Sequence, residues 1–71
     1  MEYLATVWHA GSKIQSHVDV RRCYGDIEAE FATSRAFVDD EVVLLDEVSE
    51  TLQMLLIDDA HDQWAMEVDE S

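Results

Sequence analysis

The chain has 71 residues, of which 17 are acidic and 4 are basic, and its formal net charge is −13. This length allows one small domain, predicted to span residues 1–71. The hydrophobic content of 48% is too high for a disordered acidic tail. The charge disfavours direct binding to nucleic acid or to an anionic membrane, and it favours basic proteins as partners.

Targeting and membrane signals are absent from the sequence pattern. The start, "MEYLATVWHAG", lacks a basic segment followed by a long apolar run. The longest aliphatic runs, "VVLL" and "MLLI", have four residues each, which is too short to span a membrane. The single Cys23 fits a reducing compartment. We expect a cytoplasmic protein.

The first part of the chain predicts a β-hairpin. Residues 3–9, "YLATVWH", alternate and are rich in aromatic and β-branched side chains, which is typical of a strand. Gly11 marks a turn. In 14–23 the alternation places one set of side chains on a single face, and this set is Ile14, Ser16, Val18 and Val20.

A second turn is predicted at Gly25, and the segment after it has two interpretations. Over 27–34, alternation places Ile27, Ala29 and Phe31 on one face, which favours a third strand. Asp26 as an N-cap, followed by a helical stripe, would make the same segment a helix. The short distance from Gly25 favours the strand.

The pattern from 38 to 57 predicts an amphipathic helix. Its apolar stripe comprises Val38, Val42, Leu45, Val48, Leu52, Leu55 and Leu56. A polar loop is expected over 58–62, a short strand over 64–68 and a frayed tail over 69–71. The predicted fold class is therefore α+β, a small antiparallel sheet packed by one acidic helix in the order β-β-β-α-β. The alternative is β-β-α-α-β.

No pattern in the sequence indicates catalysis. His9, His17 and Cys23 lie on the predicted hairpin but lack the close ligand spacing of zinc sites. The segment "DDAHD" offers oxygen and nitrogen donors without the glycine and glutamate of a calcium loop. Cys23 has no base positioned beside it in the sequence. We therefore predict no enzyme, no metal site and no cofactor.

The predicted helix indicates a binding surface instead. Its acids stand at i,i+3 and i,i+4 spacings with no lysine between them, an arrangement that destabilises a helix by a few tenths of a kcal/mol per pair. Apolar side chains within an acidic field are also typical of protein interfaces. The predicted partner-binding residues are Asp39, Asp40, Val43, Asp46, Glu47, Glu50, Met54 and Ile57.

The few basic residues gather in the first part of the chain. Residues 1–25 have two acids and three bases, for a net charge of +1, whereas residues 26–71 have 15 acids and Arg35 alone, for a net charge of −14. Lys13, Arg21 and Arg22 form the basic cluster. These side chains are expected to pair with acids of the same molecule or of a second copy, so a homodimer is possible.

Acids on a helix face lie about 5–6 Å apart, a separation of the same order as that of phosphates along one DNA strand. In size, acidity and lack of catalytic residues, the chain resembles the small DNA-mimic inhibitors of phages and mobile elements, of the anti-restriction and anti-CRISPR type. The resemblance is one of composition over residues 26–71. It implies a non-enzymatic inhibitor of a basic nucleic-acid-binding protein, which acts in the host cell cytoplasm if a phage encodes it.

Three rival interpretations stay open. An acidic antitoxin or immunity-type protein would use the same surface against a basic toxin or nuclease. A generic domain from a salt-loving organism would be acidic without a partner, although the nearly neutral first 25 residues fit that poorly. An enzyme with an acidic metal site is the least favoured.

Overall fold

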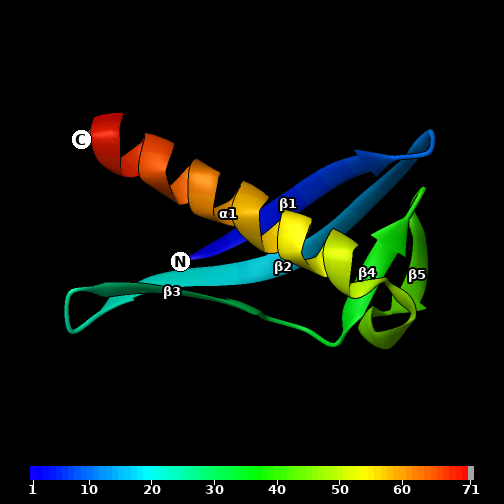
Figure 1. Ribbon diagram of the computed structural model, residues 1–71, viewed down its shortest axis with the longest axis horizontal. Helices are drawn as coiled ribbons and strands as arrows, with labels where there is room; N and C mark the ends of the chain where they lie inside the picture. The colour runs from blue at the N-terminus through cyan, green and yellow to red at the C-terminus, as the bar shows by residue number, and fades with distance from the viewer. Residues whose placement is uncertain (71) are drawn as a thin grey trace.

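The computed structural model describes residues 1–70, with side chains up to Val68. It consists of one antiparallel sheet and one long helix that lies across it (Figure 1). The elements in chain order are β1 (Glu2–His9), β2 (Ser12–Cys23), β3 (Asp26–Phe31), β4 (Arg35–Val38), β5 (Glu41–Leu44), a 3-10 turn η1 (Leu45–Glu47) and α1 (Glu50–Glu70).

Three tight turns of two residues build the sheet. In each turn both residues have positive φ, which is the geometry that fits the twist of an antiparallel hairpin. The turns are Ala10–Gly11, Tyr24–Gly25 and Asp39–Asp40. The first two use glycine, whereas the third uses two aspartates with φ of 50° and 71°, a conformation that aspartate tolerates better than most residues.

The long strand β2 is the centre of the sheet. β1 pairs with one side of it, in a register that places Ala5 opposite Ser16. β3 and β4 share the other side, with Val18 opposite Phe31 and Ile14 opposite Val38. β5 then pairs with β4 alone, so the strand order is β1-β2-β4-β5.

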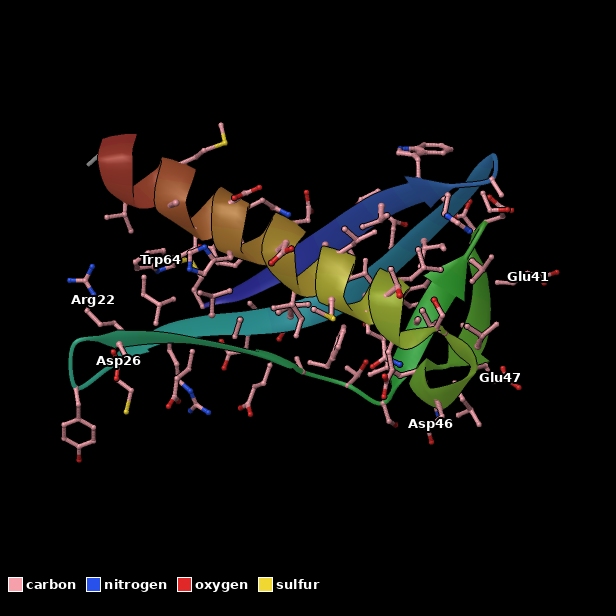
Figure 2. All side chains as sticks on the ribbon, viewed as in Figure 1. Arg22, Asp26, Glu41, Asp46, Glu47 and Trp64 are labelled. Carbon is pink, nitrogen blue, oxygen red and sulfur yellow. The ribbon has the colours of Figure 1, made fainter. Side chains whose placement is uncertain are left out.

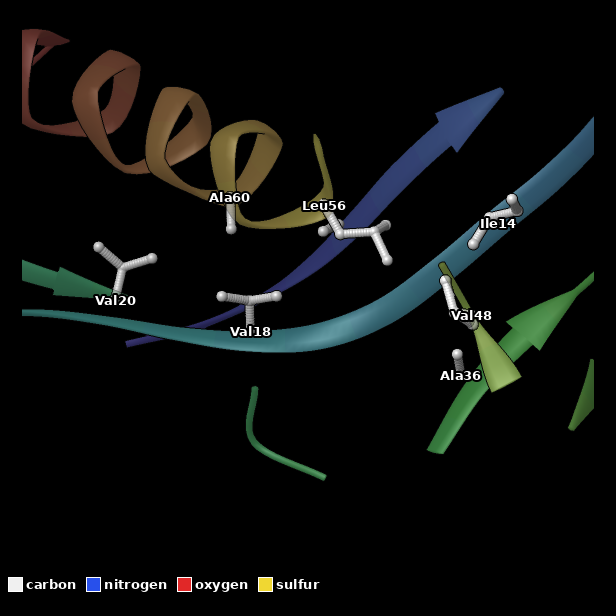
Figure 3. Packing of buried hydrophobic residues seen from close by; sticks show 8 residues of the cluster. Ile14, Val18, Val20, Ala36, Val48, Leu56 and Ala60 are labelled. Atoms are coloured by element: carbon white, nitrogen blue, oxygen red, sulfur yellow. The ribbon is translucent and has the colours of Figure 1, made fainter. Parts of the chain in front are cut away.

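The hydrophobic core lies between the sheet and α1 (Figure 3). The helix contributes a stripe with i,i+4 spacing, in which Leu56 and Ala60 are fully buried and Leu52 and Trp64 are half-buried. The buried apolar residues are Ala5, Ile14, Val18, Val20, Ala36, Val48, Leu56 and Ala60. Ser16, which is also buried, donates its hydroxyl hydrogen to the carbonyl of Arg35 at 2.9 Å.

Local hydrogen bonds define where the helix begins. The hydroxyl of Ser49 accepts a hydrogen bond from the amide of Leu52 at 3.3 Å, as an N-cap residue does. The side chain of Gln53 donates to the carbonyls of Leu45 and Val48 at 3.0 and 2.8 Å. These contacts join η1 to the first turn of α1.

The predicted α+β class is confirmed, and so is a small antiparallel sheet packed by one acidic helix. The predicted order of the elements is corrected to β-β-β-β-β-α. The helix predicted over 38–57 is wrong before Glu50, because Asp39–Asp40 form a turn and Val42 and Val43 lie in β5. The predicted loop 58–62 and strand 64–68 are wrong as well, since both belong to α1.

The predictions for the first part of the chain are correct. The β1–β2 hairpin forms, and all four residues predicted to face inward from β2 are buried. Residues 27–31 form a strand, so the helical alternative is wrong there, and 32–34 form a bend. Of the tail predicted to be frayed, α1 includes 69 and 70, and Ser71 lies outside the described residues. No helix within 1–70 is long and apolar enough to cross a membrane.

Candidate acidic interaction surface

Two of the predicted surface acids are used within the fold. Asp39 and Asp40 form the β4–β5 turn, and both contact Lys13 on β2. A carboxylate oxygen of Asp39 accepts the backbone amide of Lys13 at 2.9 Å. A carboxylate oxygen of Asp40 lies 3.2 Å from Nζ of Lys13. These two acids therefore hold the β4–β5 hairpin against β2, and the hypothesis that they stand on a helix face is wrong.

Acids elsewhere also have internal partners. Arg21 binds Glu30 at 2.6 Å, the terminal ammonium binds Asp19 at 3.0 Å, and Nδ1 of His17 lies 3.0 Å from Glu2. Arg22 lies over the ring of Trp64, 5.5 Å from its centroid. Of the predicted basic cluster, Lys13 and Arg21 pair with acids of the same molecule, as one interpretation expected, whereas Arg22 contacts an aromatic ring.

Asp59 closes the outer edge of β1. Its carboxylate accepts the backbone amide of Thr6 at 3.0 Å and the side-chain amide of Gln63 at 2.9 Å. Gln63 in turn donates to the carbonyl of Leu4 at 3.1 Å. Two helix side chains therefore bind one N–H and one C=O at the outer edge of β1, groups that would otherwise be free to pair with another chain.

Four exposed acids remain together at one end of the molecule. Figure 2 shows Glu41, Asp46 and Glu47 around β5 and η1, at the end opposite Arg22 and Trp64. Glu50 follows as the first residue of α1. Among the described residues, no lysine, arginine or histidine forms a salt bridge with these acids. We call Glu41, Asp46, Glu47 and Glu50 the acidic end.

Exposed apolar side chains accompany the acidic end. Met54, one helical turn after Glu50, is 69% exposed, and Val42 and Leu44 of β5 are 58% and 57% exposed. By contrast, Val43 and Ile57 are half-buried and pack against the core. Of the predicted partner-binding residues, Asp46, Glu47, Glu50 and Met54 are exposed at or next to the acidic end, and the other four are mainly in structural contacts.

The prediction of a helix over 38–57 missed part of this surface. Val42 was expected in the core stripe of a helix, and neither Glu41 nor Leu44 was predicted as a binding residue. In a strand, side chains alternate between the two faces, so Val43 points to the core and Val42 and Leu44 point to the uncovered face of the sheet. The β-branched pair Val42–Val43 after a possible aspartate turn was the signal for a strand.

The candidate metal ligands do not come together in the fold. His9 and Cys23 lie at opposite ends of the β1–β2 hairpin. Asp58, Asp59, His61 and Asp62 lie along α1, where Asp59 is already bound to Thr6. No group of three metal-binding side chains is present within the described part of the chain.

A hollow of about 430 Å³ lies at the other end of the molecule, between α1 and the sheet. Its lining residues are Met1, Tyr3, Val20, Arg21, Arg22, Trp64, Glu67 and Val68. The hydroxyl of Tyr3 donates to a carboxylate oxygen of Glu67 at 2.5 Å. This hydrogen bond raises the pKa of Tyr3 to about 12, with smaller contributions from desolvation and from the negative charge of Glu67.

Comparisons with protein-family models, with curated proteins and with solved structures found no match to this chain.

Proposed function

We propose that this protein is a non-enzymatic inhibitor or regulator that binds a basic, nucleic-acid-binding protein through its acidic end. The observation that carries the proposal is the arrangement of Glu41, Asp46, Glu47 and Glu50, which have no salt-bridge partner within the described residues. In the chain, Glu41 and Asp46 stand on either side of the exposed Val42 and Leu44, and Glu50 is followed one helical turn later by the exposed Met54.

This arrangement combines two contributions to binding. Charges at the rim of an interface steer the encounter and exclude partners of like charge, whereas apolar side chains at its centre contribute free energy when they leave water. A surface that binds nucleic acid presents lysine and arginine, and the acidic end is complementary in charge to such a surface. The protein would then occupy that surface in place of the phosphate backbone, as a DNA mimic does.

The test is a competition experiment with matched charge variants. Partners are captured from the native host on the immobilised protein and identified, and the complex is then challenged with duplex DNA and with increasing salt. Asp46→Lys with Glu47→Lys should abolish capture. Asp58→Lys with Asp62→Lys changes the net charge equally, from −13 to −9, because each substitution adds two charges. It should leave capture intact.

Release of the partner by duplex DNA, together with a steep loss of affinity in salt, is the expected result. A partner that holds DNA and this protein at the same time contradicts mimicry. A captured basic toxin that binds no DNA would support the immunity-type alternative. If the protein unfolds in dilute buffer and folds only in molar salt, the interpretation as a domain adapted to a salty habitat is favoured.

A further inference from the structure

We propose that the partner adds an extended strand to the free edge of β5, so that recognition by the acidic end uses backbone hydrogen bonds as well as charge. This inference rests on the proposed function and specifies how the partner binds.

The register of the β4–β5 hairpin determines which groups point outward. In an antiparallel ladder, hydrogen-bonded pairs alternate with non-hydrogen-bonded pairs. The amide of Leu45 donates to the carbonyl of Ser34 at 2.8 Å, so residues 41, 43 and 45 bond towards β4. The N–H and C=O groups of Val42 and Leu44 therefore point away from the sheet.

These outward groups have no partner among the described residues. The edge is also apolar, because Val42 and Leu44 are more than half exposed and their side chains lie on the uncovered face of the sheet beside Phe37. An exposed apolar edge strand with free backbone groups is a template for strand addition.

The free edge of β3 fits an added strand less well. Its side chains on the uncovered face are Asp26, Glu28 and Glu30, so a strand beside them gains no apolar contact across the pair. Charged side chains of this kind are a common protection of sheet edges. Next to β5 the corresponding neighbours are Val42 and Leu44, which favours the β5 edge.

The charges around β5 select the occupant. Glu41 begins the strand, and Asp46 and Glu47 lie in η1, which follows it. A second copy of this chain would bring the same acids against them, which is unfavourable. A complementary segment has basic residues on both sides of two apolar residues, in the order basic–apolar–any–apolar–basic. The two apolar residues then lie opposite Val42 and Leu44.

The probe for the test is an acetylated and amidated peptide with the sequence Lys-Val-Thr-Val-Lys. Titration into the isotope-labelled full chain should shift the amide resonances of Val42 and Leu44 and slow their hydrogen exchange. A peptide with N-methyl groups on both valines has lost the donors that pair with β5, and it should bind at least about tenfold more weakly. The counterpart Glu-Val-Thr-Val-Glu should not bind.

A protein variant tests the same contact from the other side. Val42→Pro removes an outward N–H at a position where an edge strand accepts proline, and it should also weaken the peptide at least about tenfold. Thermal unfolding and the resonances of the core show whether the variant keeps its fold. If it does not, the N-methylated peptide answers the question without any change in the protein.

Several results would overturn the inference. These are the absence of shifts at millimolar peptide, shifts confined to Ile27, Ala29 and Phe31, equal binding of the acidic peptide, or protection of the β5 amides by the protein's own self-association. The natural partner separates the two proposals. If Asp46→Lys with Glu47→Lys abolishes its binding while Val42→Pro has no effect, the proposed function stands and strand addition fails. If neither variant has an effect, both fail.

Discussion

Two edges of the sheet, those of β1 and β5, differ in what satisfies their backbone groups. At β1, the amide of Thr6 and the carbonyl of Leu4 bind Asp59 and Gln63 of α1. At β5, the corresponding groups of Val42 and Leu44 have no partner within residues 1–70. The comparison shows that one long helix binds backbone groups at the β1 edge and leaves the β5 edge available.

The reason lies in the length and direction of α1. The helix begins after η1 and runs across β1, β2 and β3, so its polar residues at i,i+4 spacing reach the edge of β1. β5 is joined to β4 by a tight turn and lies at the far end of the strand order. Asp59 has a structural role at the β1 edge. The acidic end, next to the β5 edge, carries uncompensated charge.

The largest effect on this comparison should come from Leu56→Ala. Leu56 is fully buried between the helix and the sheet, and replacement of a buried leucine by alanine costs about 2–5 kcal/mol. The free energy of unfolding, measured in urea, should fall by an amount in this range. Leu55→Ala is the control, since Leu55 is 43% exposed and should cost far less. Equal losses would show that α1 does not pack as described.

Replacement of Asp59 should make the amide exchange at the β1 edge resemble that at the β5 edge. In the wild type, the Thr6 amide should exchange slowly and the Val42 amide quickly. Asp59→Ala leaves the Thr6 amide without its acceptor, which should cost about 1–3 kcal/mol and bring its exchange close to that of Val42. Asp58→Ala removes a neighbouring exposed acid and should change neither quantity appreciably. Slow exchange of Thr6 in the Asp59 variant would contradict closure by this side chain.

The smallest effect concerns the contact between Tyr3 and Glu67, which joins β1 to the last part of α1. Because the folded-state pKa of Tyr3 is raised from 10.0 to about 12, its contribution to stability is present below pH 10 and is lost as the pH rises through about 12. The ultraviolet titration of tyrosinate should show this group ionising late. Glu67→Gln should move its ionisation towards pH 10, and Tyr3→Phe should remove it. An unchanged late ionisation in the Glu67 variant would exclude this hydrogen bond as the cause.

The sequence predicted the first half of the fold well, since its turns have glycine and its strands alternate. In β2 the inward residues Ile14, Ser16, Val18 and Val20 are separated by polar residues, and this period of two has no helical counterpart. The second half failed at Asp39–Asp40. Two aspartates before an apolar run are typical of a helix N-terminus, but here they form a turn with positive φ.

The prediction of the surface failed in part for the same reason. A helical period through 38–57 placed Val42 inside and Val43 outside, whereas the strand places them the other way round. Asp46, Glu47, Glu50 and Met54 were identified as surface residues because they are exposed in either conformation. The interaction of Asp39 and Asp40 with Lys13 joins residues more than 25 positions apart, and no local pattern reports such a contact.

Composition and local periodicity by themselves determined the α+β class, the β1–β2–β3 hairpins and the strongly acidic character of the chain, because these depend on the residues present and on their spacing. Only the tertiary structure decided which acids are neutralised and which edge of the sheet stays open. Both depend on where α1 lies against the sheet. That position follows from burial of Leu56 and Ala60 against β1 and β2, which are distant in sequence. The stretch "VDDEVVLLDEVSE" forms the β4–β5 turn, β5 and η1, and it carries the exposed acidic end.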